Sequence, residues 1–375
     1  MTLNTPNDRM SPRARVEAAL RGEEPDMVPF THYDTLFPRC AVERQLRNDG
    51  LCIVQRRPSV FTVDSPNVSR EEVHFTGSDG RARIRTIIRT PAGTLSSIHI
   101  TAPIGDRPAD QVMSWTSWRE ERLFKGPADY EPLEFMIQDR HYSPNYEVFQ
   151  AQAELMGDDA IMRAQIPYEP LQEIIIEYMG IDQFAIEWAE RRERVMRLHS
   201  IMVEDRRKIY PLVARSPALI ANYGGNVAPE VVGRTRFEQL IIPCYDEAAE
   251  VLHAHGKLLG VHFDANVRAL APGIARSKLD YVEAFSPHPS SDMTLAEARA
   301  AWPDKILWIN FPSAIHLEPI PTIEAMTRRL LHEAAPGHRF LIGITEDVPA
   351  DRWQQSLCAI MRVIREDGRL PMECA

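Results

Sequence analysis

The sequence has few cysteines, and none of them stands in a spacing typical of a structural metal site. Its five cysteines are scattered over 375 residues, and no two of them form a CxxC pair. An odd number without paired spacing argues against a disulfide framework and against a cysteine-rich zinc site. We therefore expect free thiols in a reduced, cytoplasmic protein.

Long apolar runs and a strongly basic surface are also missing. No apolar stretch approaches the roughly 18 residues of a membrane-spanning helix, and the N-terminus has no apolar segment typical of a signal peptide. The net charge is −10, and lysines and arginines form no stripe. These absences argue against a membrane protein, and against nucleic acid or an anionic membrane surface as the main partner.

A phosphate-binding glycine-rich loop is absent as well. Gly224-Gly225-Asn226 follows a strand-like segment, but it lacks both the spacing and the lysine of such a loop. The chain also contains no internal repeat and no low-complexity segment. The fold and the function must therefore be inferred from the pattern of single segments and from the polar residues at their ends.

From about residue 145 onward, strand-like apolar segments alternate with helical ones. This alternation predicts parallel β–α–β units, and two segments nearer the N-terminus raise the count to about eight strands. We predict a (β/α)8 TIM-type barrel forming a single domain over residues 1–375, with an open doubly wound sheet as the alternative. The expected strands are Met27–Phe30, Cys52–Val63, Ala160–Ile166, Ala218–Tyr223, Leu258–His262, Tyr281–Phe285, Ile306–Phe311 and Phe340–Ile344.

Residues 65–125 differ in pattern from the rest of the chain. The alternating segments Ala82–Arg89 and Thr94–Thr101 are rich in β-branched residues and are separated by turn signals. They predict an antiparallel β-meander inserted into the barrel domain. We expect Trp115 and Trp118 to pack this insertion down. Its strands could also form the surface of a homodimer.

The segment Leu258–Asn266 joins an apolar run to a polar end. Because residues i and i+2 of a strand share a face, His262 and Asp264 should point the same way and Phe263 the other way. An imidazole beside a carboxylate can bind a divalent metal ion or transfer a proton. A simple hydrogen-bonded pair without function explains the same pattern equally well.

Other strand-like segments carry polar residues near their carboxyl ends, where the active site of a barrel lies. Asn222, Glu283 and Asn310 are the least expected, because each stands inside an apolar strand and needs a buried partner or a ligand. For Glu283, a buried salt bridge and a role in the site are equally compatible with the pattern. We predict catalytic roles for Asn222, Glu283, Asn310 and Glu346.

A further set of residues near the strand ends would line a pocket for a small molecule. The aromatic side chains among them suit an aryl ether, although aromatic residues in such places are also ordinary barrel packing. We predict substrate contacts for Arg163, Tyr168, Tyr223, Phe263 and Phe311.

Three segments match, in order, segments of a known family. They are SPRARVEAALRGEEPDMVPF at 11–30, the long segment from NYGGN to HFDAN at 222–266, and FLIGITEDVP at 340–349. Their order resembles the uroporphyrinogen decarboxylase superfamily over nearly the whole chain. The resemblance implies a single barrel domain with the same order of elements.

The sequence departs from the decarboxylase branch of that superfamily. Its first strand continues as PFTHYDTLFPRC, without the arginine-rich loop of true decarboxylases, and no FSDI-like segment occurs. The other branch contains corrinoid-dependent methyltransferases, of which those acting on thiols hold zinc with an HxC pair and a distant cysteine. Here His262 and Asp264 occupy the HxC position, and Glu346 stands near the last strand. The resemblance therefore implies a Zn²⁺ site of His262, Asp264 and Glu346.

Replacing two thiolates by carboxylates makes a zinc site harder and more Lewis-acidic, which suits an oxygen or nitrogen substrate. We expect a methyltransferase that moves a methyl group from a small methoxylated or N-methylated compound to a corrinoid (cobalamin). The metal ion, or Glu346 as an acid, would assist the leaving oxygen. The string at 139–144 lacks the glycine of a DxHxxG corrinoid signature, so we expect the corrinoid on a separate partner protein.

Two other functions fit the same pattern. A metal-free decarboxylase or lyase would use His262 and Glu283 as acid and base on a small carboxylated substrate. A non-catalytic binding protein would keep the pocket without the chemistry. Metal content and turnover distinguish the three functions.

Overall fold

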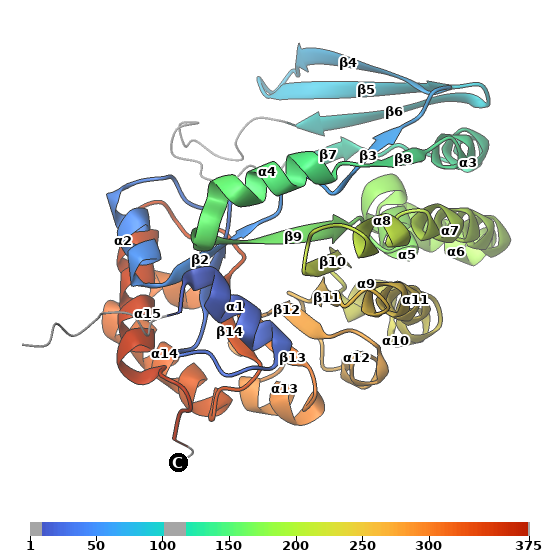
Figure 1. Ribbon diagram of the computed structural model, residues 1–375. Helices are drawn as coiled ribbons and strands as arrows, with labels where there is room; N and C mark the ends of the chain where they lie inside the picture. Colours follow the sequence, from blue (N-terminus) through green and yellow to red (C-terminus); the bar gives the residue numbers. More distant parts are fainter. Residues whose placement is uncertain (1–9, 101–117, 374–375) are drawn as a thin grey trace, which may run out of the picture.

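The computed structural model describes residues 10–100 and 118–373. At its centre is a closed barrel of eight strands in the order β1-β14-β13-β12-β11-β10-β9-β2 (Figure 1). Every neighbouring pair is parallel. The predicted (β/α)8 barrel is confirmed, and the closure of the sheet excludes the open doubly wound alternative.

The barrel strands are almost entirely buried, because helices cover their outer face and side chains fill the interior. Four of them match the predicted bounds residue for residue. The eight are β1 Phe30–Tyr33, β2 Leu51–Gln55, β9 Ala160–Ile166, β10 Ile220–Gly225, β11 Leu258–His262, β12 Tyr281–Phe285, β13 Ile306–Asn310 and β14 Phe340–Ile344.

The first barrel strand lies later in the chain than the predicted Met27–Phe30. Met27 instead forms an isolated antiparallel bridge with Arg369, and pairing with β14 begins at Phe30. This correction matters for the site, because it places Tyr33 at the carboxyl end of the strand.

The predicted strand Cys52–Val63 is divided in two. Its first part is β2, and its second part, β3 (Phe61–Asp64), leaves the barrel to pair with β8 (His141–Pro144). Pro58 lies in the break, where a residue without a backbone N–H cannot extend a ladder of hydrogen bonds.

The helices lie mainly around the outside of the barrel. None of those described has both the length and the apolar character that crossing a membrane requires. They are α1 Pro12–Arg21, α2 Ala41–Asp49, α3 Tyr130–Gln138, α4 Tyr146–Met156, α5 Pro170–Glu173, the π-helix η4 Ile174–Met179, α6 Ile181–Glu190, α7 Arg192–Arg207, α8 Tyr210–Ala214, α9 Pro229–Val232, α10 Arg234–Arg236, the π-helix η5 Phe237–Ile241, α11 Ile242–His253, α12 Ala271–Arg276, α13 Leu295–Ala301, α14 Ile320–Ala334 and α15 Trp353–Asp367, with short 3₁₀ turns at η2 Pro127–Asp129, η3 Gly157–Asp159 and η6 Ser313–Leu317.

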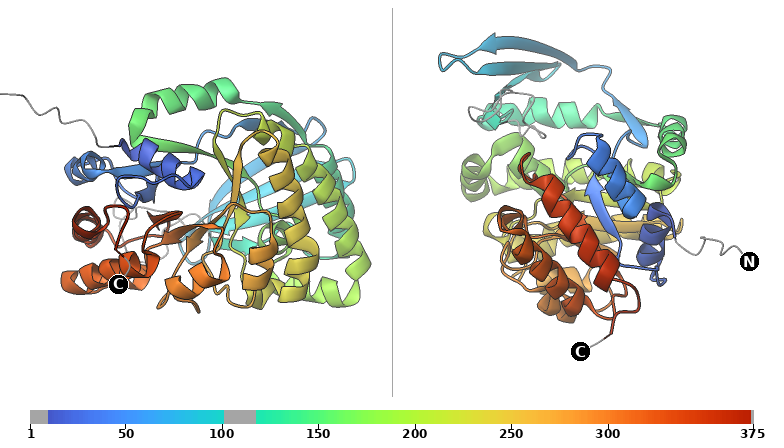
Figure 2. Two further views of the ribbon diagram at one scale, coloured as in Figure 1. Left: turned by 60° about the horizontal axis from the view of Figure 1, so that its bottom comes forward. Right: turned by 90° about the vertical axis from the view of Figure 1, so that its left-hand side faces the viewer.

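Between β2 and β9 the chain forms a region that stands off the barrel (Figures 1 and 2). Its larger sheet is antiparallel, in the order β4-β5-β6-β7, and it contacts α3. The antiparallel insertion is thus observed, and with β3 and β8 it extends beyond the expected 65–125. The strands of the larger sheet are β4 Ser69–Thr76, β5 Ala82–Thr90, β6 Gly93–Ile100 and β7 Trp118–Glu121.

Trp118 does not anchor this insertion as predicted. Trp118 is 61% exposed, so it contributes little packing, and Trp115 lies outside the described residues. The buried side chains of Leu95 and Ile98 on β6 supply apolar packing instead.

Candidate metal centre and active-site cavity

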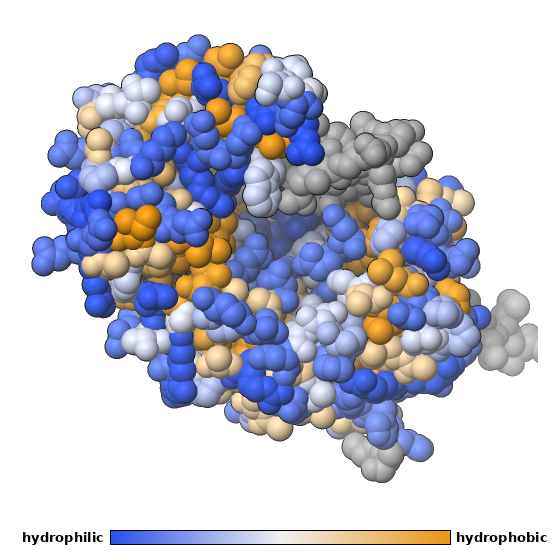
Figure 3. Space-filling view, turned by 180° about the vertical axis from the view of Figure 1, so that it is seen from behind, coloured by the Kyte–Doolittle hydropathy of each residue, from blue (hydrophilic) through white to orange (hydrophobic). Residues whose placement is uncertain are grey.

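A cavity of about 800 Å³ opens at the carboxyl ends of the barrel strands. This volume is in the range of small-molecule sites. Seen from behind, the surface of the molecule is hollowed near its centre, where hydrophilic residues gather (Figure 3). The loops that follow β2, β9, β10, β11 and β14 contribute to the wall of the cavity, as does the last residue of β1, so residues far apart in the chain meet there.

Three side chains with metal-binding atoms converge on this wall. His262, Asp264 and Glu346 each offer one ligand atom, and these atoms all lie within 4.8 Å of one another. His262 Nε2 is 3.5 Å from a carboxylate oxygen of Asp264 and 3.8 Å from one of Glu346. The three side chains are partly exposed and can be reached from the cavity. The structure thus brings together the three residues that the sequence selected.

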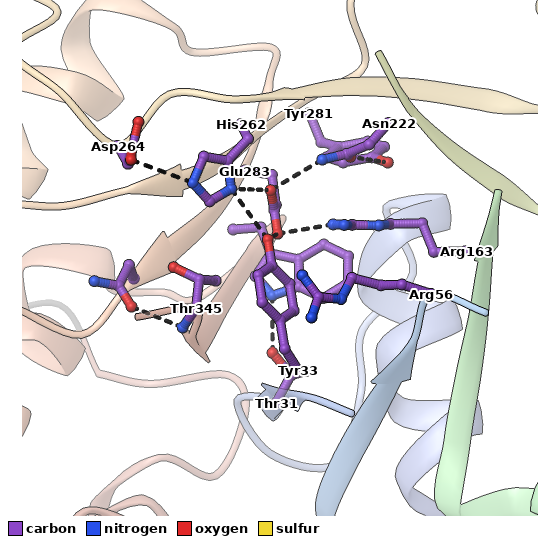
Figure 4. A network of polar contacts seen from close by, with 12 residues as sticks. Thr31, Tyr33, Arg56, Arg163, Asn222, His262, Asp264, Tyr281, Glu283 and Thr345 are labelled. Carbon is purple, nitrogen blue, oxygen red and sulfur yellow. Dashed lines mark hydrogen bonds and ion pairs between the residues drawn. The ribbon is translucent and has the colours of Figure 1, made fainter. Parts of the chain in front are cut away.

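The other ring nitrogen of His262 is already engaged. Its Nδ1 lies 2.9 Å from Glu283 Oε2 and 3.0 Å from the Tyr33 hydroxyl (Figure 4). Metal-binding histidines typically use one nitrogen for the ion and donate the other N–H to a carboxylate, which fixes the ring. His262 therefore presents Nε2 to Asp264 and Glu346 in the orientation that a ligand needs.

Glu283 is the buried anchor of this network. Its side chain is fully buried, and Oε1 accepts hydrogen bonds from Arg163 at 2.8 Å and from the Tyr33 hydroxyl. Its other oxygen accepts one from Asn222 at 3.0 Å and faces His262 (Figure 4). The buried salt bridge that the sequence allowed is therefore present, directly behind the site. Glu283 acts on the cavity by holding His262.

The charges of the network set the protonation of its members. Burial by itself raises the pKa of Glu283, but Arg163 and His262 outweigh it and hold that pKa well below its usual range. Burial lowers the pKa of His262, but Tyr33, Glu283 and the hydrogen bonds to Asp264 and Glu283 raise it well above its usual value.

One glycine allows β10 to approach His262. Gly225 has a φ of 156°, and a Cβ built there would lie 2.6 Å from the Cβ of His262. The strand register shifts between Asn222 and Gly225, so that Gly225 pairs with His262. Gly225 thus makes room for the histidine, whereas a Cβ at Gly224 would lie 2.7 Å from the Cα of Tyr168.

Tyr33 and Arg56 are site residues that the sequence reasoning missed. Both line the cavity, and the guanidinium carbon of Arg56 lies 3.8 Å from the centre of the Tyr33 ring. Arg56 is also held by Asp34, at 3.0 Å. The available signal was the polar run Thr31–Asp34 after an apolar start. It was missed because the strand was predicted to end at Phe30.

Three buried polar atoms on the cavity wall have no hydrogen-bond partner among the described residues. They are Nε of Arg163, Oε1 of Gln165 and Oγ1 of Thr345. A buried polar group without a partner costs about 1–3 kcal/mol, so such groups are usually satisfied by water or a ligand.

The predicted substrate contacts divide into two groups. Arg163 and Tyr168 line the cavity. Tyr223, Phe263 and Phe311 are fully buried and pack against aromatic residues of the surrounding helices. They are not among the described residues that line the cavity. Successive side chains of a strand point to opposite faces, and these three point outward from the barrel. The presence of aromatic residues near the strand ends could not show this.

The two predicted asparagines also differ. Asn222 lines the cavity as well as holding Glu283. Asn310 is buried, and its amide oxygen accepts a hydrogen bond of 2.9 Å from the backbone N–H of Thr345. Asn310 therefore holds the chain that leads to Glu346, and its catalytic role stays a prediction.

The ligand atoms of the cluster fit a divalent cation. One imidazole nitrogen and two carboxylates form a set that binds zinc, and a tetrahedral zinc ion separates such atoms by about 3.3 Å. The observed 3.5 and 3.8 Å are close to this value. Small rotations of the partly exposed carboxylates would complete the site.

Comparison with solved structures shows the fold of the whole chain in another protein. The structure is similar to a methyltransferase from Methanosarcina mazei, at 14% sequence identity and a TM-score of 0.55, over 96% of this chain and 99% of that chain. An FMN-binding β-glucuronidase from Facaelibacterium prausnitzii L2-6 aligns over 78% of this chain and 52% of its own, at 11% identity, with a TM-score of 0.29 that supports no argument. No known protein family and no curated protein matches the sequence.

Proposed function

We propose that the protein is a metal-assisted methyltransferase. It would move a methyl group from a small methoxylated or N-methylated compound to a corrinoid carried by a separate protein. The observation that supports this most is the convergence of His262, Asp264 and Glu346 on the wall of the cavity. Similarity in fold to a methyltransferase over nearly the whole chain agrees with methyl transfer in general. The donor and the acceptor follow from the resemblance to the corrinoid-dependent branch.

The zinc ion would be held by His262 Nε2 and by the carboxylates of Asp264 and Glu346. Bound there, it would supply Lewis acidity to the oxygen or nitrogen that carries the methyl group. Glu283 and Tyr33 hold the imidazole from the opposite side, so that Nε2 faces the cavity. Because this support is buried, the ligand orientation does not depend on the substrate.

The reaction breaks the bond between the methyl carbon and the oxygen or nitrogen of the substrate. The corrinoid of the partner protein would accept the methyl group and would supply the electron pair of the new bond. The electron pair of the broken bond stays on the oxygen or nitrogen that leaves, and this atom takes up a proton. As a ligand of the zinc ion Glu346 would be deprotonated, so the ion would stabilise the leaving atom and water would supply the proton.

The polar side chains of Arg163, Gln165 and Thr345 line the cavity and suit a substrate with polar groups. Tyr168 adds an aromatic surface. A methoxylated ring that carries a further polar substituent would satisfy these groups.

The metal-free lyase with His262 and Glu283 as acid and base has less support. Both carboxylate oxygens of Glu283 are already hydrogen-bonded, and its side chain is fully buried. A general base must be able to reach the substrate proton. The remaining alternative is a binding protein without catalysis. An assay that detects methyl transfer distinguishes it from the methyltransferase.

The test is elemental analysis of the purified protein, followed by a methylation assay of a reduced corrinoid protein with a panel of methoxylated and N-methylated compounds. The His262→Ala variant should lose one equivalent of zinc per chain. Its rate should fall by about 100-fold or more, because the ion contributes several kcal/mol. Glu346→Gln should lower both the zinc content and the rate, because it replaces a carboxylate ligand by a neutral amide.

The matched control is His253→Ala. His253 is also paired with a carboxylate, at 2.8 Å from Asp280, but that pair lies at the amino end of β12. This variant should keep both the zinc and the rate. A His262→Ala variant that methylates the corrinoid as fast as wild-type protein would refute the proposal.

A further inference from the structure

A second cluster of ligand atoms lies outside the cavity, in the interior. Glu169, His199 and Cys244 each offer one ligand atom, and these atoms lie within 4.8 Å of one another. Glu169 precedes α5, His199 lies on α7 and Cys244 lies on α11, so three separate elements meet. The exposed fractions are 0%, 6% and 5%, so the cluster is closed to solvent. None of the proposed chemistry of the cavity uses these groups.

The geometry resembles that of a closed zinc site. His199 Nε2 is 3.3 Å from Glu169 Oε1, which is long for a hydrogen bond. It equals the separation of about 3.3 Å between nitrogen and oxygen ligands of a tetrahedral zinc ion. Carboxylate, imidazole and thiol are all established zinc ligands, and structural sites use them in buried positions.

The charges of the cluster also favour a divalent cation. In the described part of the chain, the single ion-pair partner of the buried Glu169 carboxylate is His199. A divalent ion bound by this carboxylate, a thiolate from Cys244 and a neutral imidazole would form a unit with no net charge. Such a unit avoids the large desolvation cost of an isolated charge in the interior.

The residue that follows Cys244 also carries a buried polar atom. The hydroxyl of Tyr245 has no hydrogen-bond partner among the described residues. A buried hydroxyl in this condition is uncommon.

We propose that Glu169, His199 and Cys244 bind a structural zinc ion behind the rim of the active-site cavity. This proposal does not depend on the proposed methyl transfer. The ion would fix the start of α5, because the second oxygen of Glu169 accepts hydrogen bonds from the backbone N–H groups of Leu171 and Gln172.

The site would in turn stiffen the rim. The side-chain amide of Gln172 donates hydrogen bonds to the carbonyls of Gly225, at 3.3 Å, and Asn226, at 2.7 Å. The backbone N–H of Asn226 donates to the carbonyl of His262, at 3.1 Å. Through these contacts the buried cluster supports the loop that packs on His262 of the proposed zinc site in the cavity.

The test is to load metal-free full-length protein with cobalt(II) and record its absorption spectrum. A thiolate bound to cobalt gives an intense charge-transfer band in the near ultraviolet, whereas the cluster at His262 contains no sulfur. Wild-type protein should show the band, and His262→Ala should keep it. Cys244→Ser should lose the band together with one equivalent of zinc, and His199→Gln should lose most of the zinc of this site.

The control is Cys52→Ser, which alters another fully buried cysteine and should leave the band unchanged. Because Cys244→Ser could fail to fold, the wild-type spectrum decides independently of any variant. Wild-type protein without a thiolate band, or a band that disappears in Cys52→Ser and persists in Cys244→Ser, would overturn the proposal. Either result would leave the zinc analysis at His262 unaffected.

Discussion

The barrel and the insertion place their charged residues in opposite ways. β12 of the barrel, Tyr281–Phe285, is fully buried, yet it carries Glu283 at its centre. β4 of the insertion, Ser69–Thr76, is exposed along most of its length, and its glutamates face solvent. A charge in solvent requires no partner, whereas a charge inside an apolar strand requires several. The first arrangement therefore marks a site, and the second marks a surface.

The same contrast holds for two arginine–glutamate pairs. The Arg163–Glu283 pair lies 2.8 Å apart with side-chain exposures of 2% and 0%. The Arg83–Glu120 pair of the insertion lies 2.6 Å apart, but Glu120 is 38% exposed. Their distances are nearly equal, so burial is what distinguishes them. Variants of the insertion can therefore serve as controls for variants of the barrel.

The largest expected effect is on the buried pair. Glu283→Gln removes the countercharge of Arg163 and should lower the free energy of unfolding by about 3–5 kcal/mol, because an unpaired charge remains in the interior. Glu120→Gln in the insertion should leave stability nearly unchanged, since solvent screens that pair. Urea unfolding of both variants measures the difference. Equal losses in the two variants would contradict the comparison.

A buried histidine of the barrel should make stability depend on pH. Burial lowers the pKa of His32 to about 4. Between pH 6.5 and 4 the unfolded chain therefore binds a proton that the folded chain does not, so stability falls as the pH falls through this window. The loss should reach about 3 kcal/mol near pH 4.

The measurement is the free energy of unfolding against pH for wild-type protein and His32→Phe, whose profile should be flatter in this window. The control is His74→Phe, at an exposed position on β4 of the insertion, which should leave the slope as in wild type. A wild-type slope that survives in His32→Phe would assign the pH dependence to other groups.

Sequence reasoning predicted the barrel well, because apolar segments of strand length alternating with helical ones admit few folds. It also selected His262, Asp264 and Glu346 together, although only the resemblance linked Glu346 to the other two. It missed Tyr33, because a four-residue strand next to prolines has no clear start in the sequence.

The sequence could not separate Tyr168 from Tyr223, because both are aromatic residues near strand ends. Tyr168 follows its strand and lines the cavity, whereas Tyr223 lies within β10 and is fully buried. This difference depends on whether each side chain points toward the cavity or toward the helices outside the barrel. The Glu169–His199–Cys244 cluster was missed for a related reason, since its members lie on three elements and share no spacing.

A glycine comparison measures how closely the rim is packed. Gly225→Ala would place a methyl group against His262 and should lower stability by about 1–3 kcal/mol, with a loss of methyl transfer as the histidine moves. Gly80→Ala in the insertion also has a positive φ, of 77°, but no atom lies within 4 Å of its added Cβ. It should cost about 1 kcal/mol from backbone strain alone, with full activity. Denaturant titration with an activity assay tests both.

The smallest effect is expected at Trp118, and it tests whether the insertion needs its tryptophan. Because this side chain is 61% exposed, Trp118→Ala should change the free energy of unfolding by no more than about 0.5 kcal/mol. Trp302 in the barrel domain is 1% exposed and donates a hydrogen bond to the Ala271 carbonyl at 3.0 Å, so Trp302→Ala should cost about 3–5 kcal/mol. A large loss in Trp118→Ala would mean that its ring is covered in solution, as it would be in a homodimer through the insertion. Analytical ultracentrifugation of the same variant would then show a change of mass.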